Sequence, residues 1–104
     1  MERKLRVKKL IQLQRIAMAI AAGTGCSLSD ILQRTNKERN VFLRVLLTRA
    51  ALDNGIPPYQ VSLFLRMNHS AGYYYEHLYW IIKSNQKYQE LEQKYKDYNE
   101  TKRI

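Results

Sequence analysis

The sequence predicts an all-α fold, a compact bundle of five to six helices in a single domain of residues 1–104. Apolar residues recur along most of the chain at spacings of three to five, the periodicity of amphipathic helices. Glycine, proline and polar turn residues interrupt this pattern at regular intervals. Strand-like alternation of apolar and polar residues extends over only a few positions at a time.

The first expected helix is amphipathic, and its apolar positions run from Leu5 to Ile20. Its start is strongly basic, and cations near a helix N-terminus oppose the helix macrodipole. We therefore interpret these basic side chains as serving solubility or an anionic partner rather than helix stability. Gly23 and Gly25 are expected to end the helix. The apolar positions are Leu5, Leu10, Leu13, Ile16, Ala17 and Ile20, and the basic positions are Arg3, Lys4, Arg6, Lys8 and Lys9.

A second, short helix is expected to begin at the sequence SLSD. Ser27 is its expected N-cap, and Asp30 completes a capping box, in which each side chain bonds a free backbone N–H. The apolar residues of this helix are Leu28, Ile31 and Leu32. The polar segment QRTNKERN follows, and on residue types alone it is a solvated loop. Its basic residues are Arg34, Lys37 and Arg39.

The third expected helix, residues 39–53, is the central and most buried one. Its apolar residues fall on one broad face. The sequence DNG closes it, because Gly55 suits the left-handed conformation that follows many helix ends. The apolar residues are Val41, Phe42, Val45, Leu46 and Leu52.

Residues 56–83 have the outline of a helix-turn-helix motif. The sequence IPPYQVSLFL starts a short helix, with proline tolerated in the first turn because those N–H groups lack intrahelical partners. In the following turn, Asn68 or Ser70 is the expected N-cap of an aromatic helix. Gly72 lies inside that helix at a cost of roughly 1 kcal/mol relative to alanine. Close approach of another backbone, from a neighbouring helix or from DNA, would explain it, and so would drift without function.

The aromatic helix divides into two faces by helical angle. The face expected to enter the core carries Ala71, Tyr75, Leu78, Tyr79 and Ile82. The opposite side carries His69, Tyr73, His77 and Trp80, with Ser70 and Tyr74 nearer the flanks. We expect Trp80 to pack against the C-terminal segment. Tyr73 and Tyr74 are either half-buried or expose their hydroxyl groups to bond phosphates.

The last expected helix, about 87–100, follows a break at SNQ. Its apolar stripe can pack back on the first helix or on a second copy of the chain, and we favour the first helix. A homodimer or another protein partner through this helix is the alternative. The stripe consists of Tyr88, Leu91, Tyr95 and Tyr98.

Composition narrows the class of function. The 104 residues include 18 Lys and Arg against 9 Asp and Glu, a net charge of +9 that favours a polyanionic partner. Cys26 is the single cysteine, so no internal disulfide forms, in keeping with a reducing cytoplasm, and we expect it to be packed as a small residue. Because no segment reads as a secretory signal or a membrane span, we expect a cytoplasmic protein with no membrane partner.

The sequence predicts neither a metal site, nor a cofactor, nor an enzymatic activity. His69 and His77 are eight residues apart, too far for one metal ion on a helix, and no Asp, Glu or Cys completes a set. No nucleophile has a base at a useful spacing, and no Gly-rich phosphate loop is present.

From Ile11 to about Tyr95, the order of segments resembles the C-terminal DNA-binding domain, domain IV, of the bacterial replication initiator DnaA. The matching segments are IQLQRIAMAIAAGTGCSLSDILQ, RTNKERN, VFLRVLLTRAALDNG, IPPYQVSLFL and MNHSAGYYYEHLYWI. The family begins its recognition helix with Asp-His-Thr/Ser-Thr-Val. The corresponding residues here are Asn68, His69, Ser70, Ala71 and Gly72, of which His69 and Ser70 match. The resemblance implies a fold of the Trp-repressor-like superfamily and a role in replication initiation.

The resemblance implies binding of double-stranded DNA, with the recognition helix in the major groove and the basic loop on the minor groove or the backbone. Asn68 in place of the family's Asp can bond an adenine edge through two hydrogen bonds. The family's preferred DNA sequence is therefore not carried over. The implied DNA-binding residues are Arg34, Lys37, Arg39, Arg66, Asn68, His69, Ser70, Tyr73 and Tyr74.

An alternative function is a protein–protein interaction module that keeps the fold but has lost sequence-specific DNA binding. The altered signature and the eight tyrosines motivate it, because exposed aromatic residues are enriched at protein interfaces.

Overall fold

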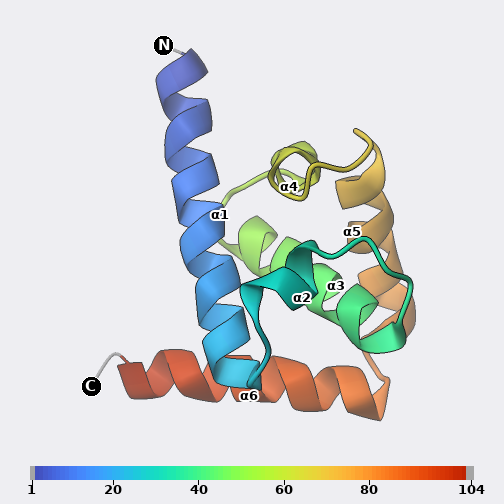
Figure 1. The fold of residues 1–104 in the computed structure, drawn as a ribbon. Coiled ribbons are helices and arrows are strands. Elements are labelled where there is room, and N and C mark those ends of the chain that lie inside the picture. The colour runs from blue at the N-terminus through green and yellow to red at the C-terminus, as the bar shows by residue number, and fades with distance from the viewer. Residues whose placement is uncertain (1, 103–104) are drawn as a thin grey trace.

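Six α-helices make up the computed structural model, which describes the backbone of residues 2–102 and the side chains of residues 7–102 (Figure 1). They are α1 (Glu2–Thr24), α2 (Leu28–Leu32), α3 (Glu38–Asp53), α4 (Pro58–Phe64), α5 (Ala71–Ile82) and α6 (Gln86–Lys102). No strand occurs among residues 2–102, and the radius of gyration of 13.0 Å is that expected for a compact chain of this length. The predicted all-α bundle is therefore confirmed. Of the predicted basic start, the side chains of Arg3, Lys4 and Arg6 lie outside the described ones.

The central helix α3 organises the hydrophobic core. Every residue from 42 to 48 is buried, because the other helices surround α3 on several sides (Figure 1). The burial prediction for this helix is confirmed, and its first residue is Glu38, one position earlier than expected. The fully buried apolar side chains around α3 include Leu13, Ala17, Ile20, Ile31 and Val61.

The predicted capping box of α2 and the predicted roles of Gly25 and Gly55 at helix ends are confirmed by their backbone geometry. The Ser27 hydroxyl accepts the Asp30 N–H at 3.1 Å, and the Asp30 carboxylate accepts the Ser27 N–H at 2.9 Å, which completes the capping box. Gly25 and Gly55 have φ of +73° and +74°, the left-handed region that glycine enters without strain. Helix α4 has proline in its first turn, as expected.

The C-terminal helix α6 packs back on α1, crossing its C-terminal end (Figure 1). The expectation that Gly23 helps to end the first helix is wrong, because Gly23 lies inside α1. A Cβ there would be 2.9 Å from the Tyr98 Cβ, so the close approach of α6 explains the glycine. Tyr88 is fully buried, with its ring edge-on to Phe42 at a centroid distance of 5.9 Å. The preference for internal packing of the stripe is therefore confirmed. A second copy or another partner on α6 stays a prediction.

Among residues 2–102, the longest helix is α1, and neither it nor any other helix there has the length and apolarity that crossing a bilayer requires.

Candidate nucleic-acid interface

The junction of α4 and α5 is built around the hydroxyl group of Ser62. This buried oxygen lies 3.0 Å from the His69 carbonyl, to which it donates, and it accepts the Gly72 N–H at 2.7 Å. A Cβ on Gly72 would lie 1.9 Å from the Pro58 carbonyl oxygen. Close approach of a neighbouring helix therefore explains Gly72, and its missing side chain lets the start of α5 lie directly on α4.

The side chains at the start of α5 face solvent. Asn68, His69 and Ser70 are all exposed. Ser70 is at the N-cap position, but its side chain makes no capping hydrogen bond, and Asn68 Oδ1 instead accepts the Ser70 N–H at 3.4 Å. The His69 ring lies 6.4 Å from the Tyr59 ring. Ser70, one of the two predicted caps, therefore occupies the predicted N-cap position but does not cap the helix through its side chain. Its hydroxyl group is left available to a ligand.

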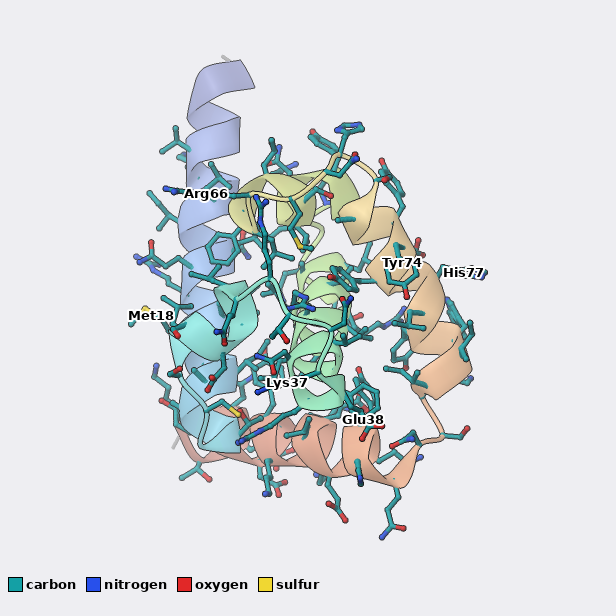
Figure 2. The ribbon with its side chains drawn as sticks, turned by 45° about the vertical axis from the view of Figure 1, so that its right-hand side comes forward. Met18, Lys37, Glu38, Arg66, Tyr74 and His77 are labelled. Atoms are coloured by element: carbon teal, nitrogen blue, oxygen red, sulfur yellow. The ribbon has the colours of Figure 1, made fainter. Side chains whose placement is uncertain are left out.

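The basic connection between α2 and α3 is tied to the turn before α5. Arg34 Nη2 donates to the carbonyl oxygen of Arg66. Arg66 has φ of +55°, an unusual left-handed conformation for a residue other than glycine. Both side chains are exposed, so two cations of the predicted interface stand together at this turn. In Figure 2, Arg66 lies well apart from Lys37, which is close to Glu38.

Arg39 lies apart from this pair. Its Nη2 is 2.9 Å from the Cys26 Sγ, near the end of α1. Cys26 itself is partly buried against the core, as expected for a packed small residue. The structure thus gathers Arg34 and Arg66 at the turn that follows α4, and it places Arg39 and Lys37 towards the start of α3.

Arg44 holds the basic connection and α5 on the central helix. The side chain is 1% exposed, and it donates to the carbonyls of Gln33 and Thr35, both at 2.6 Å, and to the Tyr75 hydroxyl at 2.8 Å. A buried guanidinium needs such partners, because its charge has lost its hydration. Arg44 is not among the residues predicted for the site, although an arginine inside the apolar run VFLRVLL is a usable signal.

The aromatic residues of α5 divide into two faces as predicted. Tyr75 is buried, and Ala71, Leu78, Tyr79 and Ile82 are partly buried against the core. Tyr73 and Tyr74 are 48% and 58% exposed, and Figure 2 shows His77 pointing away from the bundle.

The expectation that Trp80 packs against the C-terminal segment is wrong. Its side chain is 55% exposed and lies outside the core. Its ring instead faces the Lys83 ammonium group and the Arg49 guanidinium, at 4.8 and 5.7 Å from the ring centroid. Cation–π contacts of this length occupy the ring without burying it.

Among the described side chains, Asp30 and Tyr88 have clearly shifted pKa values. Hydrogen bonds from the Ser27 N–H and the Ser27 hydroxyl lower the pKa of Asp30. Burial raises the pKa of Tyr88, and the neighbouring Glu92 carboxylate adds to this effect. Neither group is near the start of α5, so both belong to the scaffold. Within the described part of the chain, no three His, Cys, Asp or Glu side chains are grouped as a metal site.

Comparison of the chain with models of protein families, with curated proteins and with solved structures gave no match. The local geometry therefore carries the functional proposal.

Proposed function

We propose that this chain is a non-enzymatic protein that binds double-stranded DNA, with α4 and α5 acting as a helix-turn-helix motif. The observation that carries the proposal is the junction at Ser62, which fixes the start of α5 on α4 while Asn68, His69 and Ser70 face solvent. The start of a helix positioned in this way is the part that enters the major groove in such motifs. The resemblance to the DnaA C-terminal domain supports the same assignment.

The exposed side chains divide into base-reading and backbone-binding groups. The Asn68 amide can both accept from and donate to an adenine edge, and His69 beside it can contact the neighbouring base. Arg34 and Arg66 stand together at the same turn and suit phosphate oxygens, as do the hydroxyl groups of Ser70, Tyr73 and Tyr74.

Arg39 and Lys37 extend the proposed interface along the α2–α3 connection. Arg39 reaches the minor groove only if its guanidinium leaves the Cys26 sulfur, which is a weak hydrogen-bond acceptor. Arg44 bonds both this connection and α5, so the distance between the basic connection and the recognition helix is held constant.

Selection of bound duplexes from a random pool, followed by fluorescence anisotropy at several salt concentrations, tests the proposal. We expect a selected sequence, and affinity that falls with salt at a log–log slope of roughly minus one per phosphate neutralised. Absence of any duplex binding at ~50 mM salt would overturn the proposal.

A second candidate function, a protein-interaction module, is favoured by one surface feature. A groove of about 730 Å³ between α1, α2 and α4 is lined by side chains that include the exposed apolar residues Val7, Ile11, Leu32 and Leu63. Arg34 and Arg66 line the same groove, which matches an amphipathic partner helix with acidic residues beside its apolar stripe. A nuclease-treated pull-down compares the wild type with Leu63→Asp. A partner lost with the variant supports this function, and equal recovery by both proteins counts against it.

A further inference from the structure

We infer a second nucleic-acid site, in which unpaired bases stack on the outward aromatic face of α5 around Trp80. Tyr73, His77 and Trp80 are exposed and follow one another at spacings of four and three, so their rings lie along one face of the helix. Trp80 is ten residues beyond Ser70, roughly 15 Å along the helix axis. The inference does not depend on duplex binding by the α5 start.

Two cations border the exposed ring of Trp80. The Arg49 guanidinium lies 4.7 Å from the Tyr79 ring centroid and is held by the Asp53 carboxylate, with 3.7 Å between Nε and Oδ1. The exposed Lys83 has its Nζ 4.8 Å from the Trp80 ring centroid. Tyr79 meets Trp80 edge to face at 5.3 Å, which supports the indole from its inner side. The cluster thus combines an exposed ring with two cations, of which Arg49 is paired with a carboxylate and Lys83 is exposed.

A nucleotide of a single strand matches both parts of this cluster. Its base has a flat face for the indole, and its phosphate pairs with an ammonium or guanidinium group. The flexible Lys83 side chain can leave the ring for a phosphate when a base takes its place. In a duplex the base faces are stacked on one another, so only an unpaired base can use the ring in this way.

A second copy of the chain is a poorer occupant of this face. Each copy has a net charge of +9, and Arg49 and Lys83 at the rim would meet like charges across a symmetric contact. Single-stranded nucleic acid carries the opposite charge and supplies ring faces in series, which matches the spacing of Tyr73, His77 and Trp80.

Trp80 is the sole tryptophan, so its fluorescence reports on this site directly. We would titrate the full chain at low salt with a 15-mer of deoxythymidine, a 15-mer of uridine and an abasic 15-mer of the same charge. We expect quenching by both base-bearing strands and at least tenfold weaker binding of the abasic strand, because stacking supplies part of the affinity. Whichever of the deoxythymidine and uridine 15-mers binds more tightly identifies the preferred ligand as DNA or RNA. Equal affinity for the abasic strand, or binding without quenching, overturns the inference.

Variants separate this site from the duplex site through the anisotropy of labelled strands. Trp80→Ala should weaken binding of the deoxythymidine 15-mer about tenfold, whereas Trp80→Phe retains most of the affinity. Ile81→Ala is the matched control, because Ile81 is 65% exposed and adjacent but has no ring. His69→Ala should weaken duplex binding and leave the single strand bound. If Trp80→Ala weakens the binding of duplex and single strand equally, the inference is overturned. It is also overturned if light scattering shows that the wild type self-associates and that only Trp80→Ala abolishes this.

Discussion

The guanidinium Nε of Arg44 lies 2.8 Å from the hydroxyl oxygen of Tyr75, and this hydrogen bond joins the middle of α3 to the inner face of α5. The same guanidinium bonds two carbonyls of the α2–α3 connection. One buried side chain therefore sets the position of the basic connection relative to the proposed recognition helix.

Replacing Arg44 should destabilise the protein and weaken duplex binding together. Arg44→Leu leaves the Tyr75 hydroxyl and two carbonyls without their donor, so the free energy of unfolding should fall by at least about 2 kcal/mol. Urea unfolding followed by circular dichroism measures this loss. Arg15→Leu is the control, because Arg15 is exposed on α1 and its replacement should change stability by no more than about 0.5 kcal/mol. Equal stability of the two variants would contradict the role given to Arg44.

Adding one methyl group at Gly72 should separate α4 from α5. Alanine is intrinsically better than glycine in a helix by about 1 kcal/mol, so an unhindered position would be stabilised. Here the new Cβ would lie 1.9 Å from the Pro58 carbonyl, a backbone atom that cannot rotate away. We expect Gly72→Ala to lower the free energy of unfolding by about 1–3 kcal/mol, the range for overpacking. A rise in the thermal unfolding midpoint would show that the two helices are less closely packed than described.

Ser27 and Ser70 both occupy N-cap positions, and their replacement should have unequal effects. Ser27→Ala removes a capping box and should cost about 1 kcal/mol. Ser70→Ala should change stability by no more than about 0.5 kcal/mol, because the Ser70 side chain makes no capping bond. Thermal unfolding of the two variants in parallel tests the difference. A comparable loss for Ser70→Ala would mean that its hydroxyl group does cap α5.

The capping box should also make stability depend on pH. Hydrogen bonds from Ser27 lower the pKa of Asp30 below its ordinary value of 3.8. A lowered folded-state pKa contributes stability that is present above pH 3.8 and is lost as the pH falls through the folded-state value. Asp30→Asn should therefore flatten the fall in stability below about pH 4 relative to the wild type. If the wild type and Asp30→Asn lose stability equally as the pH falls, the assignment of this pH dependence to Asp30 is contradicted.

Two substitutions should separate base reading from backbone binding. His69→Ala should weaken binding to the selected duplex by about 1–3 kcal/mol and relax the sequence preference at one base pair. Binding to unrelated duplexes should change little. Arg39→Ala should weaken binding to all duplexes to a similar extent and reduce the log–log slope of affinity against salt by about one. Anisotropy with selected and scrambled duplexes measures both effects. A sequence-dependent loss at Arg39, or a uniform loss at His69, would reverse their proposed roles.

The helices themselves were predictable because their signals are local. The periodicity of apolar residues located the central helix, and Ser27, Asp30 and Gly55 marked helix ends through contacts within a few residues. The inward face of α5 followed from helical angle alone. These features depend on neighbours in sequence, which a sequence shows directly.

The candidate site was predictable in position and only partly in arrangement. Asn68, His69 and Ser70 lie exposed at the start of α5, as expected, but the contact of Arg34 with the Arg66 carbonyl joins residues distant in the chain. Arg44 was missed for the same reason. The packing of Trp80 was predicted wrongly because helical angle gives only the direction of a side chain. Its contacts depend on the positions of the Arg49 and Lys83 cations.

The contact of Gly23 with Tyr98 joins the first and last helices of the bundle. Contacts between such distant segments close a long loop of chain, and the entropy of that closure must be overcome before the contact contributes. Assembly of the intervening helices shortens that loop, so we expect α6 to dock late in folding. Tyr88 is the one buried residue of α6. Because local opening tends to release the least buried segments first, the amide hydrogens of α6 should exchange early.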